Sequence, residues 1–337
     1  MIPVKRRAII LLVMSTVFTG SSIVSQEGTQ RIVWPAPPQE PRIEFLQQIA
    51  SPADIGVERS WLGAIFDWIV GANESLTGMV KPMGVAVDRK KKLYVTDPGA
   101  GCVHIFDREN KEYEKLTTAD DLPLRSPVGV AVADDGTIYV SDSERRQVIA
   151  YDDNGDEKFI VPSMFHRPTG VVIHRGKLYV TDTVLHKVLV FDLSGQFLYD
   201  FGQRGTAQGE FNYPVFLASS DRLLVVDAMN FRVQMLGDSG QAFGSFGRAG
   251  DAQGTFAHPK GVAVDREGHI YVADALFDAF QIFDNKGTLL LVVGTSGRGN
   301  GEFSIPDGIC TDRDNRIYVV DSLNRRVQVF RYIGNSQ

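Results

Sequence analysis

Six aspartates recur at the same place in a repeated pattern, each at the end of a run such as Ile-Tyr-Val. A ring of six carboxylates could bind a divalent cation or act in acid–base chemistry. Each aspartate also precedes a tight turn, however, where its side chain can accept hydrogen bonds from backbone N–H groups. We therefore expect a structural role in the turns for all six: Asp97, Asp142, Asp182, Asp227, Asp274 and Asp321.

Three glycine-rich segments share the spacing Gly-x-x-Gly-x-x-x-Gly-x-Phe, at residues 202–211, 247–256 and 294–303. The spacing superficially resembles a phosphate-binding loop. Such a loop leads from a strand into a helix and presents the helix N-terminus to the phosphate, and none of the three segments does so. We interpret them as connectors between repeats, each held in place by its phenylalanine.

These segments belong to six repeats, each of which begins at a proline. The prolines stand at positions 82, 127, 168, 214, 259 and 306, so successive repeats start 41 to 47 residues apart. Within each repeat, β-branched and aromatic runs alternate with Gly, Asp and Asn, which is typical of strands and turns. Four short strands per repeat of this length predict one blade of a propeller. The sequence therefore predicts an all-β fold: a six-bladed β-propeller of four-stranded antiparallel blades over residues 82–331.

The repeated motifs are Pro-x-Gly-Val-Ala-Val-Asp, Ile-Tyr-Val-x-Asp and Asn-x-Arg-Val-Gln-x-Phe, and their series resembles NHL repeats across residues 82–330. Single blades depart from the third motif: its arginine is shifted by one at Arg146, and blade 1 has Cys102 near this position. The resemblance implies a propeller that most often works by binding other molecules. A propeller fold also hosts enzymes, so the resemblance does not decide function.

The last repeat ends without a fourth strand, which would leave an open sheet edge. Residues 41–49 carry the fourth-strand pattern, because Glu44-Phe45-Leu46 matches Gln196-Phe197-Leu198 of the third repeat. We expect this segment to complete the last blade and to close the ring as a latch strand.

The residue after each repeated proline should lie at the entrance of the central channel. The amidating lyases have similar repeats and use histidines around this channel, and gluconolactonase-like propellers need carboxylate and amide groups there. The positions here do not form a set of metal ligands: Met83, Val128, Thr169, Val215, Lys260 and Asp307. None of the six histidines stands among them: His104, His166, His174, His186, His258 and His269. We expect no catalytic residue, metal or cofactor; the alternative is a metal-dependent propeller lyase or lactonase acting in the central channel.

The turns between the second and third strands share one face with the connectors between blades, because strands alternate in direction. Polar residues are usual in turns, yet four successive turns carry apolar side chains, and contiguous exposed apolar area usually marks an interaction site. We expect a partner-binding face centred on Phe231 and Phe277 and formed by Val184, Leu185, Met229, Phe231, Leu276, Phe277 and Leu323.

Residues 1–25 have the pattern of a secretory signal peptide: a basic start, an apolar run from Ala8 to Phe18, and small residues up to Ser25. We expect a periplasmic or extracellular protein, tethered to the membrane if the segment is not cleaved. Cleavage removes Lys5, Arg6 and Arg7 and takes the formal charge from −6 to −6 − 3 = −9. This acidic balance disfavours nucleic acid as a partner.

The extension over residues 26–81 contains, besides the latch strand, an apolar segment from Trp61 to Val70. It predicts a short helix that is apolar all round, and such a helix is buried, oligomerises or contacts a membrane. Two alternatives stay open: the helix plugs the loop face, or the face is left to a partner, and both hold if the helix covers only part of the face. Peripheral membrane contact through residues 61–70 is a further expectation. We expect a monomeric, non-catalytic scaffold that binds a protein or peptide of the cell envelope.

Overall fold

The computed structural model describes residues 31–57, 78–161 and 164–334. The chain divides into two units, Met1–Arg31 and Ile32–Gln337, and the second contains every element described below. The predicted signal peptide (1–25) and the predicted apolar helix (61–70) lie outside the described residues. Among the described residues, no helix is long and apolar enough to cross a membrane.

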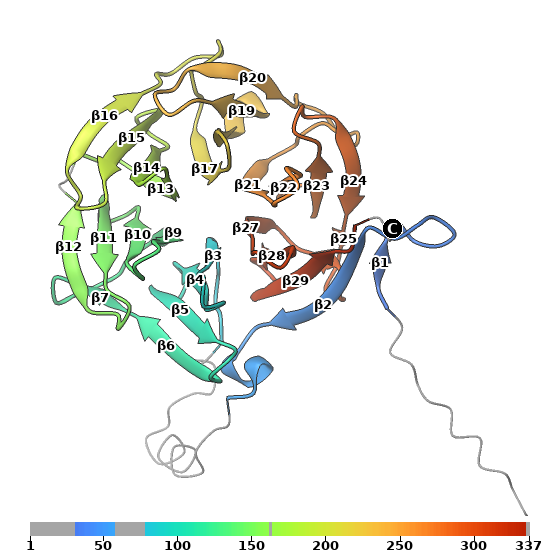
Figure 1. Ribbon diagram of the computed structural model, residues 1–337, viewed down its shortest axis with the longest axis horizontal. Coiled ribbons are helices and arrows are strands. Elements are labelled where there is room, and N and C mark those ends of the chain that lie inside the picture. Colours follow the sequence, from blue (N-terminus) through green and yellow to red (C-terminus); the bar gives the residue numbers. More distant parts are fainter. Residues whose placement is uncertain (1–30, 58–77, 162–163, 335–337) are drawn as a thin grey trace, which may run out of the picture. The chain divides into compact units, whose positions relative to one another are not determined.

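Six antiparallel sheets stand around a common centre as the blades of a propeller (Figure 1). The first three blades, from the centre outward, are as follows. Blade 1 contains β3 (Val85–Val87), β4 (Leu93–Asp97), β5 (Cys102–Asp107) and β6 (Glu112–Leu116); blade 2 contains β9 (Pro127–Val132), β10 (Ile138–Asp142), β11 (Gln147–Tyr151) and β12 (Glu157–Val161); blade 3 contains β13 (Pro168–His174), β14 (Lys177–Asp182), β15 (Lys187–Asp192) and β16 (Phe197–Phe201).

The other three blades follow the same order. Blade 4 contains β17 (Pro214–Ser219), β18 (Leu223–Asp227), β19 (Arg232–Leu236) and β20 (Ala242–Phe246); blade 5 contains β21 (Pro259–Val264), β22 (Ile270–Asp274), β23 (Ala279–Phe283) and β24 (Leu289–Val293); blade 6 contains β27 (Pro306–Thr311), β28 (Arg316–Asp321), β29 (Arg326–Tyr332) and β2 (Ile43–Ile49). The predicted six-bladed propeller is confirmed.

Short strands and 3-10 turns supplement the six blades. The strand β1 (Val33–Trp34) adds a fifth strand to blade 6, β7 (Thr118–Ala119) pairs with β8 (Leu122–Pro123), and β25 (Thr295–Ser296) pairs in parallel with β26 (Glu302–Phe303). Two single 3-10 turns, η1 (Pro52–Ile55) and η3 (Ala228–Asn230), complete the described elements.

The position of each strand in its blade explains its composition. Every residue of β4 and of β22 is buried, because a middle strand packs against neighbouring blades on both faces. The outer strand β24 keeps only its last residue, Val293, fully buried. Between neighbouring blades, aromatic rings such as Phe280 and Phe330 meet edge to face, with centroids 5.3 Å apart.

The glycine two residues after each proline permits the inner strands of neighbouring blades to approach closely. A Cβ at Gly84 would lie 2.2 Å from the carbonyl oxygen of Val128, and one at Gly129 would lie 2.2 Å from that of Thr169. Blade 4 has Phe216 at this position, and its ring contributes to the lining of both cavities described below.

The latch strand predicted at residues 41–49 is present as β2, which pairs antiparallel with β29 at the joint between the two ends of the fold (Figure 1). Phe45 lies opposite Phe330, and the register shifts between Phe45 and Gln47. In blade 3, Phe197 lies opposite Phe191 with the same shift after it. The expectation that an N-terminal strand closes the last blade is confirmed.

Candidate functional site

The six turn aspartates are fully buried at the ends of the second strands. Asp142 shows their role in blade 2: its carboxylate accepts backbone N–H groups of Arg125 and Ser126 at 2.8 and 3.1 Å, and of Arg145 at 3.0 Å. Each carboxylate thus ties the connector that enters its blade, and in most blades also its own turn, to the end of the second strand. Blades 1, 3 and 5 repeat the arrangement with Asp97, Asp182 and Asp274.

Blades 4 and 6 add side-chain donors to the same carboxylate. In blade 6, Asp321 accepts from Asn324, Arg326 and Gln328 at distances of 2.8 to 3.0 Å. Asp227 accepts from the equivalent Asn, Arg and Gln of blade 4. The third repeated motif, Asn-x-Arg-Val-Gln, therefore supplies partners for the turn aspartate.

Blade 1 replaces this arginine and glutamine with Cys102 and His104. His104 Nε2 lies 3.2 Å from Asp97 Oδ2 and 3.5 Å from Cys102 Sγ, and Nδ1 lies 2.7 Å from the Tyr113 hydroxyl. Cysteine beside histidine is also the arrangement of a nucleophile and its base. Here burial raises the pKa of Cys102 to about 11, and both side chains are fully buried, so His104 acts as a structural partner of Asp97.

A cavity of about 280 Å³ lies at one end of the centre of the propeller, and we call it the channel mouth. Residues on either side of the repeated prolines line it, together with residues of the turns after the second strands. The six residues expected at the channel entrance all contribute to the lining: Met83, Val128, Thr169, Val215, Lys260 and Asp307.

Asp307 is the buried acid of the channel mouth. Its side chain is 4% exposed, and the Oδ1 atom has no hydrogen-bond partner among the described residues. Burial raises the pKa of the Asp307 carboxyl, against the opposing effect of the positive charges of Lys260 and Lys81. A buried carboxyl without a partner costs folding free energy, which distinguishes it from the six satisfied turn aspartates.

Of the six histidines, His258 alone lines the channel mouth. Burial and the neighbouring Lys260 lower its pKa, so the ring is neutral at pH 7. His269 is bonded to Asp265, and His186 accepts the backbone N–H of Tyr213. Within the described ranges, no three side chains of the His, Cys, Asp or Glu types lie close enough together to hold a metal ion.

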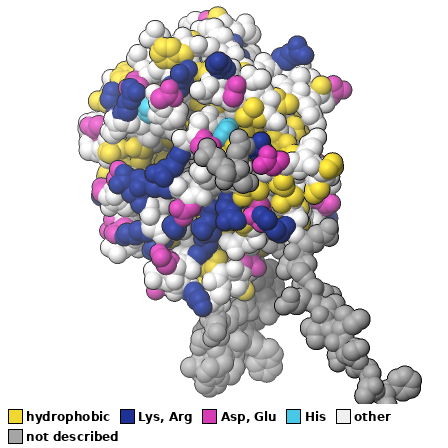
Figure 2. All heavy atoms as spheres, turned by 45° about the vertical axis from the view of Figure 1, so that its right-hand side comes forward, with side chains coloured by type: hydrophobic (Ala, Val, Ile, Leu, Met, Phe, Trp, Pro, Cys, Tyr) yellow, Lys and Arg dark blue, Asp and Glu magenta, His cyan; other side chains and the backbone are white. Residues whose placement is uncertain are grey.

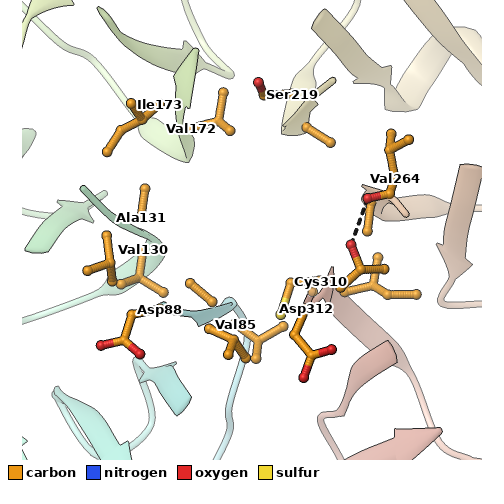
Figure 3. A pocket seen from close by; sticks show the side chains of 18 of the residues that line it. Val85, Asp88, Val130, Ala131, Val172, Ile173, Ser219, Val264, Cys310 and Asp312 are labelled. Carbon is orange, nitrogen blue, oxygen red and sulfur yellow. Dashed lines mark hydrogen bonds between the residues drawn. The ribbon is translucent and has the colours of Figure 1, made fainter. Parts of the chain in front are cut away.

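A wider cavity, of about 900 Å³, opens at the other end of the channel. Apolar side chains of the innermost strands surround its centre, among them Val85, Val130 and Val172 (Figure 3). Surface ion pairs lie around its rim, such as Lys91 with Asp314 at 2.8 Å.

Ser219, which lines the wider cavity, belongs to a hydrogen-bonded chain of three side chains. His174 Nδ1 lies 2.8 Å from the Ser219 hydroxyl, and Nε2 lies 3.1 Å from Asp238 Oδ1. Arg175 donates to Asp238 as well, at 3.1 Å. The group joins blade 3 to blade 4, as the hydrogen bond from the Tyr139 hydroxyl to the Leu193 carbonyl joins blade 2 to blade 3.

The face that carries the channel mouth also carries the turns after the second strands, and we call it the loop face. Leu276 is 67% exposed and Leu323 54% exposed, and Val184 and Met229 are also exposed. Phe231 and Phe277 are the residues on which the predicted partner-binding face is centred. Both rings are half-buried, as is Leu185, and Phe231 packs against the core of blade 4.

Two further exposed side chains, Tyr213 and Ile305, belong to the connectors next to these turns. The Met229 N–H donates to the Asn212 carbonyl, and the Leu323 N–H donates to the Ser304 carbonyl, so turn and connector are directly joined. Figure 2 shows that apolar side chains and Lys and Arg side chains gather in separate regions of the surface.

Sequence comparisons identify the repeats. The Teneurin NHL domain model matches residues 117–302, more than half of the chain, and the NHL repeat model matches residues 303–330. Protein brain tumor of Drosophila melanogaster is 28% identical over 129 residues, 36% of this chain and 12% of that protein. E3 ubiquitin-protein ligase NHLRC1 of Homo sapiens is 33% identical over 127 residues, 34% of this chain and 30% of that protein. The chain thus spans less than a third of the length of either relative.

Solved structures share the fold at low identity. A streptogramin B lyase superposes with a TM-score of 0.56 at 12% identity, covering 75% of this chain and 94% of that chain. A gluconolactonase from Xanthomonas campestris gives 0.58 at 16%, covering 75% and 86%. A chain of a nidogen/laminin complex gives 0.54 at 20%, covering 68% and 85%. Because these identities show the fold alone, the repeats and the family models carry the assignment: the chain belongs to the NHL-repeat family.

Proposed function

We propose that this protein is a non-catalytic scaffold that binds a protein or peptide partner of the cell envelope through its loop face. The observation that carries the proposal is a row of exposed apolar side chains on four consecutive turns, in blades 3 to 6. They are Val184, Met229, Leu276 and Leu323. Exposed apolar side chains gathered on one face of a protein are typical of an interaction site.

The turns that carry these side chains have a fixed backbone, which favours binding. Asp274 accepts the N–H groups of Leu276 and Phe277 at 3.1 and 3.3 Å, and Asp182 accepts those of Val184 and Leu185 at 3.0 Å. A backbone that is already ordered loses little conformational entropy when a partner binds.

The cell envelope enters the proposal through the N-terminal residues, whose basic start and apolar run have the pattern of an export signal. The fold neighbour from the nidogen/laminin complex adds a precedent, since its name places a propeller of this shape in an assembly of two proteins.

Site-specific photo-crosslinking in the native host tests the proposal. A photoreactive amino acid at position 276 or 323 should crosslink to the same partner, whereas the same amino acid at position 198 or 290 should not. Leu198 and Leu290 are the matched controls, because they are exposed leucines on the outer strands of blades 3 and 5, away from the loop face.

The double variant Leu276→Asp, Leu323→Asp should keep its melting temperature and lose the crosslink formed from a probe at Met229. The double variant Leu198→Asp, Leu290→Asp should keep the crosslink. Equal crosslinking from loop-face and outer-strand positions would reject the loop face as the binding surface.

The alternative of a metal-dependent lyase or lactonase needs a set of ligands in the channel. The channel mouth combines Lys260 with the single acid Asp307, and this pair is not a ligand set for zinc or calcium. No contact among the described residues favours that alternative.

A further inference from the structure

The channel mouth holds positive charges that have no ion-pair partner. Lys260 and Arg167 line the cavity, and neither side chain is hydrogen-bonded or ion-paired to another described residue. By contrast, two buried or half-buried arginines elsewhere in the propeller are paired, Arg232 with Asp227 and Arg326 with Asp321, each at 2.8 Å. Two unpaired cations that line one cavity favour a ligand with a negative charge.

The buried acid at the channel mouth is not required by the fold. Asp307 stands where blades 1, 2 and 4 have Met83, Val128 and Val215, so an uncharged side chain fits this position in the ring. Its Oδ1 atom is buried without a partner. A buried polar group that lowers the stability of the fold and also lines a cavity indicates a binding role.

The remaining wall of the cavity combines apolar side chains with hydroxyl-bearing ones such as Ser126, Thr169 and Thr183. Met83, Val128, Val215 and Phe216 line it beside the charged groups. A volume of about 280 Å³ suits a molecule of a few heavy atoms. The ligand that matches this wall therefore combines a short hydrocarbon part with one charged group.

We propose that the channel mouth binds the carboxylate of a small organic acid, or the same group at the end of a peptide. Lys260 and Arg167 supply the positive charge, the Asp307 carboxyl donates a hydrogen bond to the ligand carboxylate, and the apolar side chains of the wall take the hydrocarbon part. Burial raises the pKa of Asp307, which favours the protonated form that donates. This site goes beyond the partner-binding face and does not depend on it.

Calorimetric titration of the full chain with butyrate tests the proposal, with butanol and butylamine as the neutral and cationic analogues. Butyrate should bind saturably, and the two analogues should not. The variant Lys260→Met should bind butyrate at least about tenfold more weakly, because it removes a charged partner. Blade 1 tolerates Met83 at the same position, so this variant should fold. Lys286→Met, an exposed lysine in the turn after β23, is the matched control and should bind as the wild type does.

Two variants of the acid separate its donor role from its charge. Asp307→Asn keeps a donor and should retain butyrate binding, whereas Asp307→Ala should lose it. In the wild type, affinity should fall as the pH rises and Asp307 ionises. The other titratable groups around the cavity all remain in Asp307→Asn: His258, Tyr213, Lys81, Lys260 and Arg167. A smaller pH dependence in that variant therefore assigns the effect to Asp307.

Paired peptides identify the source of the carboxylate. If a short apolar peptide with a free C-terminus competes with butyrate and the same peptide with a C-terminal amide does not, the natural ligand is the end of a peptide chain. If butyrate binds and neither peptide does, the natural ligand is a free organic acid. The proposal is overturned if butyrate shows no saturable binding, if Lys260→Met binds it as tightly as the wild type, or if butylamine binds in its place.

Discussion

Arg326 of the last blade and Gln48 of the latch strand are hydrogen-bonded, with 2.6 Å between Nη1 and Oε1. The same guanidinium donates to Asp321 and to the carbonyls of Gly299 and Glu302. One side chain thus connects the latch strand, the last turn and the connector that enters the last blade. Arg232 forms the equivalent bonds to Asp227 and to its own connector in blade 4.

The latch strand should contribute strongly to stability. Ile49 is fully buried where β2 meets β29, so Ile49→Ala should lower the free energy of unfolding by about 2–5 kcal/mol. Leu46 is exposed on the same strand, and Leu46→Ala should change the free energy of unfolding by less than about 0.5 kcal/mol. Chemical denaturation of both variants measures the difference. Equal changes in the free energy of unfolding would contradict a stabilising role of the latch strand.

The buried pair of Asp321 and Arg326 should be costly to break from one side. Asp321→Ala removes the only carboxylate paired with the buried guanidinium among the described residues, and an acceptor of two other side chains, so the free energy of unfolding should fall by about 3–5 kcal/mol. Asp251→Ala, at an exposed aspartate, is the control. Denaturation of Asp321→Ala, Arg326→Ala and the double variant should show a double loss smaller than the sum, and strict additivity would refute the coupling.

Both cysteines should be unreactive in the folded protein. Burial raises the pKa of the Cys102 thiol to about 11 and raises that of Cys310 as well, and the thiolate is the reactive form. A thiol reagent at pH 7.5 should label neither residue quickly until the chain is unfolded, when both react. Cys310 lines the wider cavity and should be labelled before Cys102, which mass spectrometry after partial labelling will show. Rapid labelling of Cys102 in native protein would contradict its burial.

The His269–Asp265 pair should make stability depend on pH. The hydrogen bond to Asp265, at 2.9 Å, raises the pKa of His269 although burial opposes it. A folded-state pKa above the unfolded value stabilises the protein below about pH 6.5, and the contribution is lost as the pH rises through the folded pKa. His269→Gln should therefore cost more stability at pH 5.5 than at pH 8.5. Thermal melts at both values, with the exposed His166→Gln as control, measure this, and an equal loss at both would disprove the linkage.

Much of the fold could be predicted because each blade repeats a local pattern. Strand composition, the proline at the start of the first strand and the aspartate at the end of the second depend on neighbours in the sequence. The latch strand was recognisable for the same reason, since Phe45 has the place in its strand that Phe197 has in blade 3.

The exposure of the turn residues could not be predicted in this way. Phe231 and Leu276 both stand in apolar turns, but Phe231 has a left-handed backbone with φ of 54°, and its ring packs against blade 4. Leu276 extends into solvent instead. Backbone conformation and the packing of one blade decide this difference, and a one-dimensional pattern of apolar residues contains neither.

The sequence by itself determined the number of blades, their strands and the strand that closes the ring, because these follow from local periodicity. Only the tertiary structure decided that Arg167, Lys260 and Asp307 line one cavity, and that Asp307 has a buried oxygen without a partner. The three residues belong to blades 3, 5 and 6, so their distances depend on how the blades pack around the ring. Such long-range packing brings together charges whose surroundings no single repeat reveals.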